Sequence, residues 1–557
     1  MKWLENLIYN INGSRFKRYM VIILTLMALG ATIMMLPTEL VLARMLPGKS
    51  TNTFSIYVDA PSGSSIEETK KITNCVVDIL KREDEVLNTE VFLGMGSPLD
   101  YAGLVKGSTL KQSENVAEIV INLTDKHHRE EPSFLMVQRL RPIMQSHCEI
   151  LKNGTSIKMI EQPAGPPTMA SIVVEVFTQD LERLRRVSGE VADILKKTDG
   201  LVDVDIMQDE LFKKYELIAD TEKISRSGIS IEQLNNILYL AFEGMNIAVK
   251  NSQHSPDQIP LFLVLSEKTK RLESVSLDSL EAKISSLRLM NQMGMLVPVS
   301  ELVTIKEVDN SPMIFSKDLR RMTNVIAETD MVSQVYPLLD AREMMMEHFS
   351  KEYVVEKEPG MTTYMFDLHL IDKKTGEKVL LRWDGEMKVT LDTFRDLGGA
   401  FISALILIFL LLVIYYKSFA ISGIILGGSF LSLTGVILGH WVADMVTTET
   451  FFLTATSLIG FIALMGVSSR NSLLLVDFAK SLISHDGMEK RRAIAVATAT
   501  RAKPIFLTAV AIILGSALLA TDPIFGGLGV ALISGTVAAV IVSLIFVPVL
   551  MFNTKAI

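Results

Sequence analysis

A single arginine interrupts a long apolar segment in the last third of the chain. Arg470 lies within residues 451–477, which carry no other charge before Asp477. Such a segment is long enough to cross a bilayer, which takes about 20 apolar residues. A guanidinium keeps its proton in proteins and is costly at membrane depth, so it persists only where an anionic or strongly polar group faces it. Arg470 therefore predicts a proton or ion pathway, and it also predicts a partner group.

The acidic residues nearest the apolar segments do not supply that partner at membrane depth. They all lie at the ends of the apolar segments: Asp396, Asp444, Glu449, Asp477 and Asp522. We therefore hypothesise that a separate chain supplies the acid, with a fragment of a longer protein as the simpler alternative. Asn471 is expected to hydrogen-bond the same acid. A solvated helix end is favoured for Asp477 over a proton exit. The competing interpretation of Arg470 is a snorkelling side chain or a purely structural ion pair.

Hydropathy predicts six membrane spans and one large extramembrane region. The spans are expected at 19–37, 397–416, 419–442, 451–478, 502–520 and 528–552. Lys and Arg lie on one side of the spans, whereas the loops 443–450 and 521–527 carry acids only. The positive-inside rule then places both termini in the cytoplasm and residues 38–395 in the periplasm or outside the cell. An uncleaved anchor is favoured over a signal peptide for the first span, because its apolar run is long and no clear cleavage site follows.

The large region alternates strand and helix signals in a repeated order. A strand at 53–59 precedes a helix at 67–80, and a second round begins with a strand at 171–177. Two rounds of strand, helix, strand and strand predict two α+β sandwiches of split-βαβ (ferredoxin-like) type beside a membrane α-helical bundle. The expected division is a cytoplasmic lead at 1–17, a membrane helix at 18–37, sandwiches at 38–162 and at 163–242 with 309–395, an insertion at 243–308, and five membrane helices at 396–553.

Two cysteines, Cys75 and Cys148, fall in the large region. A disulfide is permitted outside the cytoplasm. Two cysteines in so long a region are more often buried small apolar side chains, so that interpretation is favoured and the disulfide stays open. The consecutive methionines at 344–346 point in different directions on a helix, so packing is favoured over a soft-metal site. We expect no resident metal.

A short segment rich in proline and glycine separates two predicted strands. Pro163, Gly165 and Pro166 specify a defined bend, which is either a structural hairpin or the rim of a substrate cleft. The chain has no nucleophile–base arrangement, Gly-rich phosphate loop or Walker-type motif. We therefore expect no enzyme, no ATP hydrolysis, no cofactor and no nucleic-acid partner.

Several motifs together resemble the C-terminal half of a resistance–nodulation–division (RND) efflux transporter of the hydrophobe and amphiphile (acriflavin resistance-like) branch. The resemblance covers essentially the whole chain and is most specific in the membrane segments 452–460 (FLTATSLIG), 466–478 (GVSSRNSLLLVDF) and 501–508 (RAKPIFLT). The large region adds 45–47 (MLP), 61–69 (PSGSSIEET), 163–167 (PAGPP), 297–302 (VPVSEL), 318–322 (DLRRM) and 382–386 (RWDGE). The two sandwiches then resemble porter subdomains, and the insertion resembles a docking subdomain.

The resemblance implies a proton-driven antiporter that works as a trimer of two-half units with a periplasmic adaptor and an outer-membrane channel. In the family, paired aspartates on a helix of the other half face a basic residue of this half. Arg470 occupies that position, where the best-known pumps more often have Lys, and Thr508 matches a polar relay residue. Lysine can lose its proton when buried but arginine cannot, so the partner acid is expected to titrate.

The expected function is therefore a half-size subunit of a bacterial inner-membrane multidrug exporter, with hydrophobic or amphiphilic substrates and the proton-accepting aspartates on a partner half. The alternatives are a non-transporting accessory or sensor, a secretion helper with an RND-like fold, and heavy-metal efflux. The basic loop at 490–503 is interpreted as topological charge in preference to an anionic-lipid contact. The sequence does not name the substrate, the partner or the stoichiometry.

Overall fold

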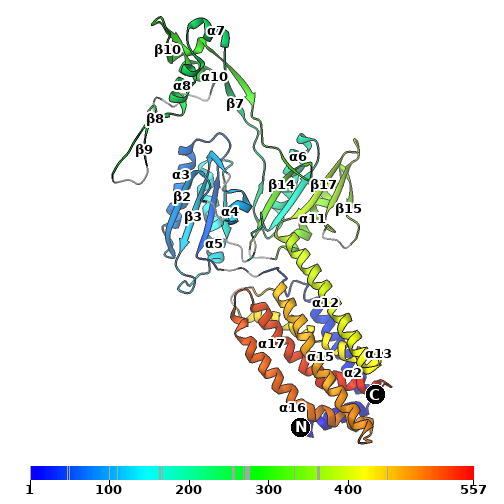
Figure 1. Ribbon diagram of the computed structural model, residues 1–557. Helices are drawn as coiled ribbons and strands as arrows, with labels where there is room; N and C mark the ends of the chain where they lie inside the picture. Colours follow the sequence, from blue (N-terminus) through cyan, green and yellow to red (C-terminus); the bar gives the residue numbers. More distant parts are fainter. Residues whose placement is uncertain are drawn as a thin grey trace. The chain divides into compact units, whose positions relative to one another are not determined.

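The computed structural model (Figure 1) describes residues 2–46, 48, 50–98, 101–108, 111–161, 165, 167–253, 258–266, 269, 272, 276–330, 333–360, 364–447 and 450–556. The chain divides into two compact units. The first unit combines Met1–Gln208 with Ile314–Ile557 and contains both sandwiches and the membrane helices. The second unit is Asp209–Met313.

The first sandwich, here called porter subdomain 1, has the predicted split-βαβ topology. Its elements are β1 (Thr53–Asp59), α3 (Ile66–Leu80), β2 (Val86–Met95), α4 (Tyr101–Lys106), β3 (Gln112–Leu123), α5 (Ser133–Cys148), a 3-10 helix (Glu149–Leu151) and β4 (Ser156–Glu161). The antiparallel sheet has the order β2-β3-β1-β4. Alternate residues of β1, Phe54, Ile56 and Val58, are fully buried, as a strand with one face against helices requires.

The cysteines form a disulfide, so the favoured interpretation of them as free apolar side chains was wrong. Cys75 on α3 and Cys148 on α5 are joined, with a Cα–Cα distance of 5.8 Å. Both helices contribute to the same buried apolar cluster, which brings the two sulfur atoms together although 73 positions separate them in sequence. The number of cysteines alone does not predict this disulfide, because it depends on how α3 and α5 pack in the tertiary structure.

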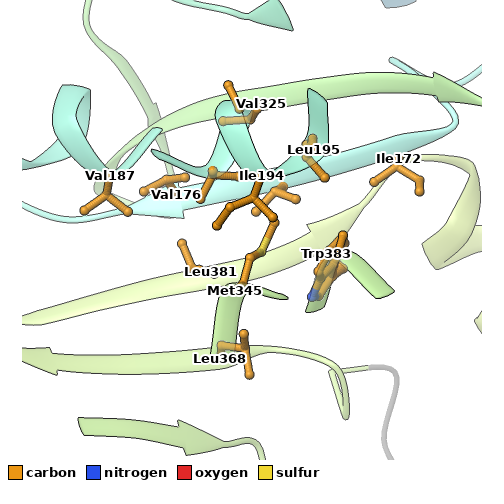
Figure 2. Close-up of a cluster of buried hydrophobic side chains, with 14 of the residues drawn as sticks. Ile172, Val176, Val187, Ile194, Leu195, Val325, Met345, Leu368, Leu381 and Trp383 are labelled. Atoms are coloured by element: carbon orange, nitrogen blue, oxygen red, sulfur yellow. The ribbon is translucent and has the colours of Figure 1, made fainter. Parts of the chain in front are cut away.

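The second sandwich, porter subdomain 2, repeats the same topology with additions. Its elements are β5 (Ile172–Phe177), α6 (Leu181–Lys197), β6 (Leu201–Ile206), β13 (Phe315–Lys317), β14 (Arg320–Thr329), α11 (Val335–Phe349), β15 (Tyr353–Lys357), β16 (Leu368–Asp372) and β17 (Lys378–Asp384). The sheet has the order β13-β14-β5-β17-β16-β15, with β6 also paired to β14. Figure 2 shows its core, where Met345 of α11 lies close to Ile194 of α6 and Leu381 of β17.

The second unit is wider than the predicted insertion at 243–308. It holds β7 (Lys213–Ala219), α7 (Thr221–Ser227), α8 (Ile231–Phe242), β8 (Met245–Lys250), β9 (Ile259–Leu263), α10 (Leu277–Ser286), β10 (Arg288–Met290), β11 (Leu296–Pro298), a 3-10 helix (Val299–Glu301) and β12 (Val303–Asp309). β7 pairs with β12, and Leu234 of α8 is buried with Ile284 of α10. These long-range contacts draw residues 209–242 into the unit.

Among the residues that the structure describes, six helical segments are long and apolar enough to cross a membrane, and they match the six predicted spans. The helices are α1 (Lys2–Gly13), α2 (Arg15–Met34), α12 (Glu386–Tyr416), α13 (Phe419–Phe430), α14 (Leu433–Val446), α15 (Ala455–Ser484), α16 (Lys490–Ala517), a 3-10 helix (Leu519–Thr521), α17 (Gly526–Ile541), a π-helix (Val542–Phe546) and α18 (Val547–Asn553). α13 with α14 forms one interrupted span, and α17 with α18 forms another. The π-helix ends at Phe546, two residues before Pro548, which lacks the N–H that an α-helix needs.

Candidate functional site

Helix α15 carries Arg470 at its middle. The helix has 30 residues from Ala455 to Ser484, so it is about 45 Å long and Arg470 lies about 20 Å from either end. Thr454 begins the helix through a capping box, in which its Oγ1 accepts a hydrogen bond from the Ser457 amide. This cap fixes where the helix starts and therefore the position of Arg470 along it.

One face of α15 packs into the bundle and the other is exposed. A Cβ at Gly460 would lie 3.1 Å from the Leu528 carbonyl oxygen, so α15 and α17 approach closely at that glycine. The exposed stripe follows helical spacing and consists of Ile459, Ala463, Gly466, Arg470 and Leu474. Arg470 therefore points away from the bundle of its own chain, with the small residues Ala463 and Gly466 beside it.

Within the described part of the chain, no hydrogen bond or ion pair reaches the Arg470 guanidinium. The acids near the spans are engaged elsewhere: Asp396 with Arg395, Asp444 with the Phe451 amide, Asp477 with the Tyr416 hydroxyl, and Asp522 with the Ile524 and Phe525 amides. Glu449 lies outside the described residues. Among the described acids near the spans, none pairs with Arg470, and the expectation that a separate chain supplies the acid stays a prediction.

The hydrogen bonds described for the other predicted relay residues do not involve Arg470. Asn471 is only 4% exposed and lies on the inner face of α15, because adjacent helical residues point in different directions. The Thr508 hydroxyl on α16 donates to the Ile505 carbonyl at 2.9 Å. The Asp477 carboxylate accepts a hydrogen bond from the Tyr416 hydroxyl at 2.7 Å. Their relay roles therefore stay predictions.

The predicted cleft segment is only partly described. Pro163 and Pro166 lie outside the described residues. Gly165 is partly buried, and a Cβ at that position would lie 2.7 Å from Leu46 Cδ1. The backbone at Gly165 therefore packs against the linker that follows α2, and its place in a substrate cleft stays a prediction.

The structure also reveals a buried polar group that the sequence reasoning missed. His440 on α14 is fully buried inside the membrane bundle. Its Nδ1 donates to the Val436 carbonyl at 2.8 Å, and its Nε2 lies 2.8 Å from the Ser457 hydroxyl of α15. The sequence contained a signal for this group, because a histidine inside an apolar span, like an arginine there, indicates a candidate functional site.

A short linker after α2 joins α15 to porter subdomain 2. Ala43 and Leu453 form a parallel β-bridge, and the Ala455 amide donates to the Met45 carbonyl at 3.1 Å. On the other side, the Ser333 hydroxyl donates to the Ala43 carbonyl, and the Tyr336 hydroxyl of α11 donates to the Leu36 carbonyl at 3.0 Å. The start of α15 is thus hydrogen-bonded to a segment that also holds the porter region.

The AcrB/AcrD/AcrF family matches residues 10–356 and 369–554. The chain belongs to this family. It is therefore a chain of an RND efflux transporter, which is a multi-pass protein of the inner membrane with a large periplasmic region. This membership confirms the predicted family, fold class and cellular location.

Relatives and solved structures match most or all of the chain. Over 524 residues it is 21% identical to the multidrug export protein AcrF of Escherichia coli (strain K12), covering 90% of this chain and 45% of AcrF. Over 373 residues it is 24% identical to the swarming motility protein SwrC of Bacillus subtilis (strain 168), covering 65% of this chain and 31% of SwrC. Two crystal forms of a heavy metal efflux pump align with 99% of the chain at TM-scores of 0.71 and 0.70 and 17% identity. They show the shared fold.

The chain is shorter than the proteins it matches. It spans less than half the length of these two curated relatives and about half of the two solved chains. Similarity over this part of their length does not show that this chain has the activities or partners of the longer proteins.

Proposed function

We propose that this chain is a half-size subunit of a proton-driven RND exporter whose proton-accepting acids lie on a complementary half. One observation carries the proposal: Arg470 lies at membrane depth on an exposed helix face, and no described residue pairs with it. A permanent charge at that depth needs an anionic partner. The exposed stripe around it contains Ala463 and Gly466, which allow another helix to approach closely.

The chemistry of the pair follows from the fixed charge of arginine. Because Arg470 stays protonated, it holds a facing carboxylate pair ionised until a proton arrives. Protonation then weakens the attraction and frees the helices to shift, which is a two-state electrostatic switch. The linker between α15 and porter subdomain 2 supports a mechanical route for that shift. Backbone hydrogen bonds at Leu453 and Ala455 join the start of α15 to the linker, and the Ser333 and Tyr336 hydroxyls join the linker to porter subdomain 2.

The proposed assembly follows the family. The complementary half supplies the acidic pair, the two-half units form a trimer, and a periplasmic adaptor and an outer-membrane channel complete the export path. The proposed substrates are small hydrophobic or amphiphilic compounds taken from the periplasm or the membrane, as multidrug export by AcrF supports. Asn471, Asp477 and Thr508 are the candidate polar groups that flank the relay.

An efflux assay in cells that carry both halves tests the proposal. Arg470→Ala should abolish energy-dependent export, while Arg470→Lys should retain part of it because the charge is kept. Arg492→Ala is the matched control, since Arg492 is an exposed arginine at the cytoplasmic start of α16 and should leave export unchanged. Full export by Arg470→Ala would contradict the proposal and favour an accessory or sensor. Secretion defects without altered drug export would favour a secretion helper.

A further inference from the structure

The face that joins the two porter subdomains is built from charges of opposite sign. Porter subdomain 1 contributes three cations, Lys106, Arg141 and Lys158, and porter subdomain 2 contributes four acids, Asp203, Asp205, Glu328 and Asp330. Lys106 Nζ lies 2.8 Å from Glu328 Oε1, and Arg141 Nη1 lies 2.9 Å from Asp330 Oδ1. Lys158 pairs with Asp205. The side chains of Arg141, Lys158 and Asp203 are buried, and those of the other four residues are partly buried, so the pairs are shielded in part from bulk water.

Asp203 is the centre of this interface. Its Oδ2 accepts hydrogen bonds from Arg141 Nε and from the Met159 amide, each at 3.2 Å. Its Oδ1 accepts one from Gln145 Nε2 at 3.2 Å. The Asp203 side chain is 1% exposed and that of Arg141 is 8% exposed. Three donors from α5 and β4 of one subdomain therefore converge on a single carboxylate of the other.

The backbone of β6 is distorted at this residue. Asp203 has a φ of 52°, in the left-handed region, and the pairing of β6 with β14 changes register between Ile326 and Glu328. A β-bulge re-aims a side chain out of the regular alternation of a strand. A strained non-glycine residue persists only where its surroundings hold it. The distortion directs the Asp203 carboxylate into porter subdomain 1.

The interface is suited to separation. The buried apolar clusters of the two subdomains share no member, so each subdomain keeps its own core. Polar faces between domains permit relative motion, because each charge regains water when the faces part. Burial raises the pKa of the Asp203 carboxyl, and the attraction of Arg141 opposes this shift. The buried carboxylate therefore carries a desolvation cost, which is removed when the two subdomains separate and water reaches Asp203.

We propose that Asp203, held by Arg141, Gln145 and the Met159 amide, is a releasable latch that sets how readily the two porter subdomains separate. The latch is a property of the periplasmic region itself. Its use in export, where parting of the subdomains would admit a substrate, rests on the proposed function.

Distances between spin labels on the full chain in nanodiscs test the latch. Labels at Arg82→Cys and Lys196→Cys place one exposed probe in each subdomain, and the native cysteines are unreactive because they are joined. Asp203→Asn removes the charge while keeping a residue type that tolerates left-handed backbone. It should raise the population of molecules with the longer label distance, relative to the population with the shorter one, by about tenfold or more. Loss of one partner of a buried pair implies a change of at least this size. Arg141→Gln should do the same from the opposite side.

Asp367→Asn is the matched control. Asp367 is 2% exposed and lies 3.0 Å from Arg382 Nε, but both residues belong to porter subdomain 2. This variant should lower stability and leave the label distances unchanged. Unchanged distances in both latch variants, or an equal change in the control, would overturn the latch. Because no transport is measured, a latch that responds as expected stands even if Arg470→Ala exports normally, and only the proposed function then fails.

Discussion

The exposed position of Arg470 predicts effects of opposite sign in the single chain and in the assembled transporter. In the chain alone, no described residue pairs with Arg470. Arg470→Leu removes a charge from membrane depth, so it should stabilise the isolated chain. In an assembly where acids face Arg470, the same change leaves those acids buried without a counter-charge, so it should destabilise the complex.

The size of each effect follows from the depth of the residue. Arg at a helix centre costs about 2.5 to 3.5 kcal/mol on insertion scales, and Leu gains about 0.3 to 0.6 kcal/mol. Arg470 lies at the middle of α15, so the exchange should favour membrane insertion of α15 by about 3 to 4 kcal/mol, and this sets the upper limit of the gain in stability of the isolated chain. Removing one partner of a buried ion pair costs about 3 to 5 kcal/mol. The two effects have opposite signs, and the loss in the complex is about 3 to 5 kcal/mol.

The assay is a denaturing-detergent titration of the full chain, purified alone and again with its partner half, and followed by the helical circular dichroism signal. Arg492→Leu is the control, because this exposed arginine lies at the cytoplasmic start of α16 and should change stability by less than about 0.5 kcal/mol. A loss of stability in the isolated chain would show that the chain neutralises Arg470 by itself, which contradicts an unpaired Arg470.

Two further predictions concern porter subdomain 1. Replacing Cys75 and Cys148 together by Ala should lower its free energy of unfolding by about 4 kcal/mol, because the bond closes a long loop over a sequence separation of 73. Urea unfolding with and without reductant checks this: reduction should lower the parent to the level of the variant and leave the variant unchanged. Burial raises the pKa of Glu161 from 4.5 to about 7, against the attraction of Arg141 and Arg44. The folded state then keeps a proton that the unfolded state releases between these values, so this stabilising contribution is full below the unfolded pKa and lost as pH rises to about 7. Glu161→Gln should therefore raise the melting temperature above pH 7, with a gain that shrinks toward pH 4; an equal gain at all pH values would contradict the assignment.

Local patterns in the sequence were sufficient to predict many of the helices and strands. The apolar spans, the alternating strand at 53–59 and the helical spacing at 335–349 all depend on neighbouring residues, and each element is present in the structure. The split-βαβ topology also followed, because the order of strands and helices repeats twice. Hydropathy also predicted a long apolar helix around Arg470, and α15 is that helix.

Long-range contacts account for what the sequence did not predict. The disulfide needs α3 and α5 on the same face of a sheet, and the wider second unit needs β7 to pair with β12. The charged face between the porter subdomains joins residues such as Arg141 and Asp330 that are far apart in sequence. No local pattern contains these pairings. Helix geometry could have predicted that the Arg470 and Asn471 side chains lie on different faces of the helix, since adjacent positions point in different directions.

A photo-crosslinking amino acid placed beside Arg470 on the exposed stripe of α15 tests whether a partner helix covers this face. Gly466 is the site, because nothing lies within 4 Å of a Cβ built there. Leu507 on α16 is the control, because it is 70% exposed and outside that stripe. We predict that Gly466 crosslinks in native membranes to a second membrane chain with adjacent aspartates in a helix, and that Leu507 does not. Crosslinks from Gly466 to lipid alone, or only to copies of this chain, would contradict the account.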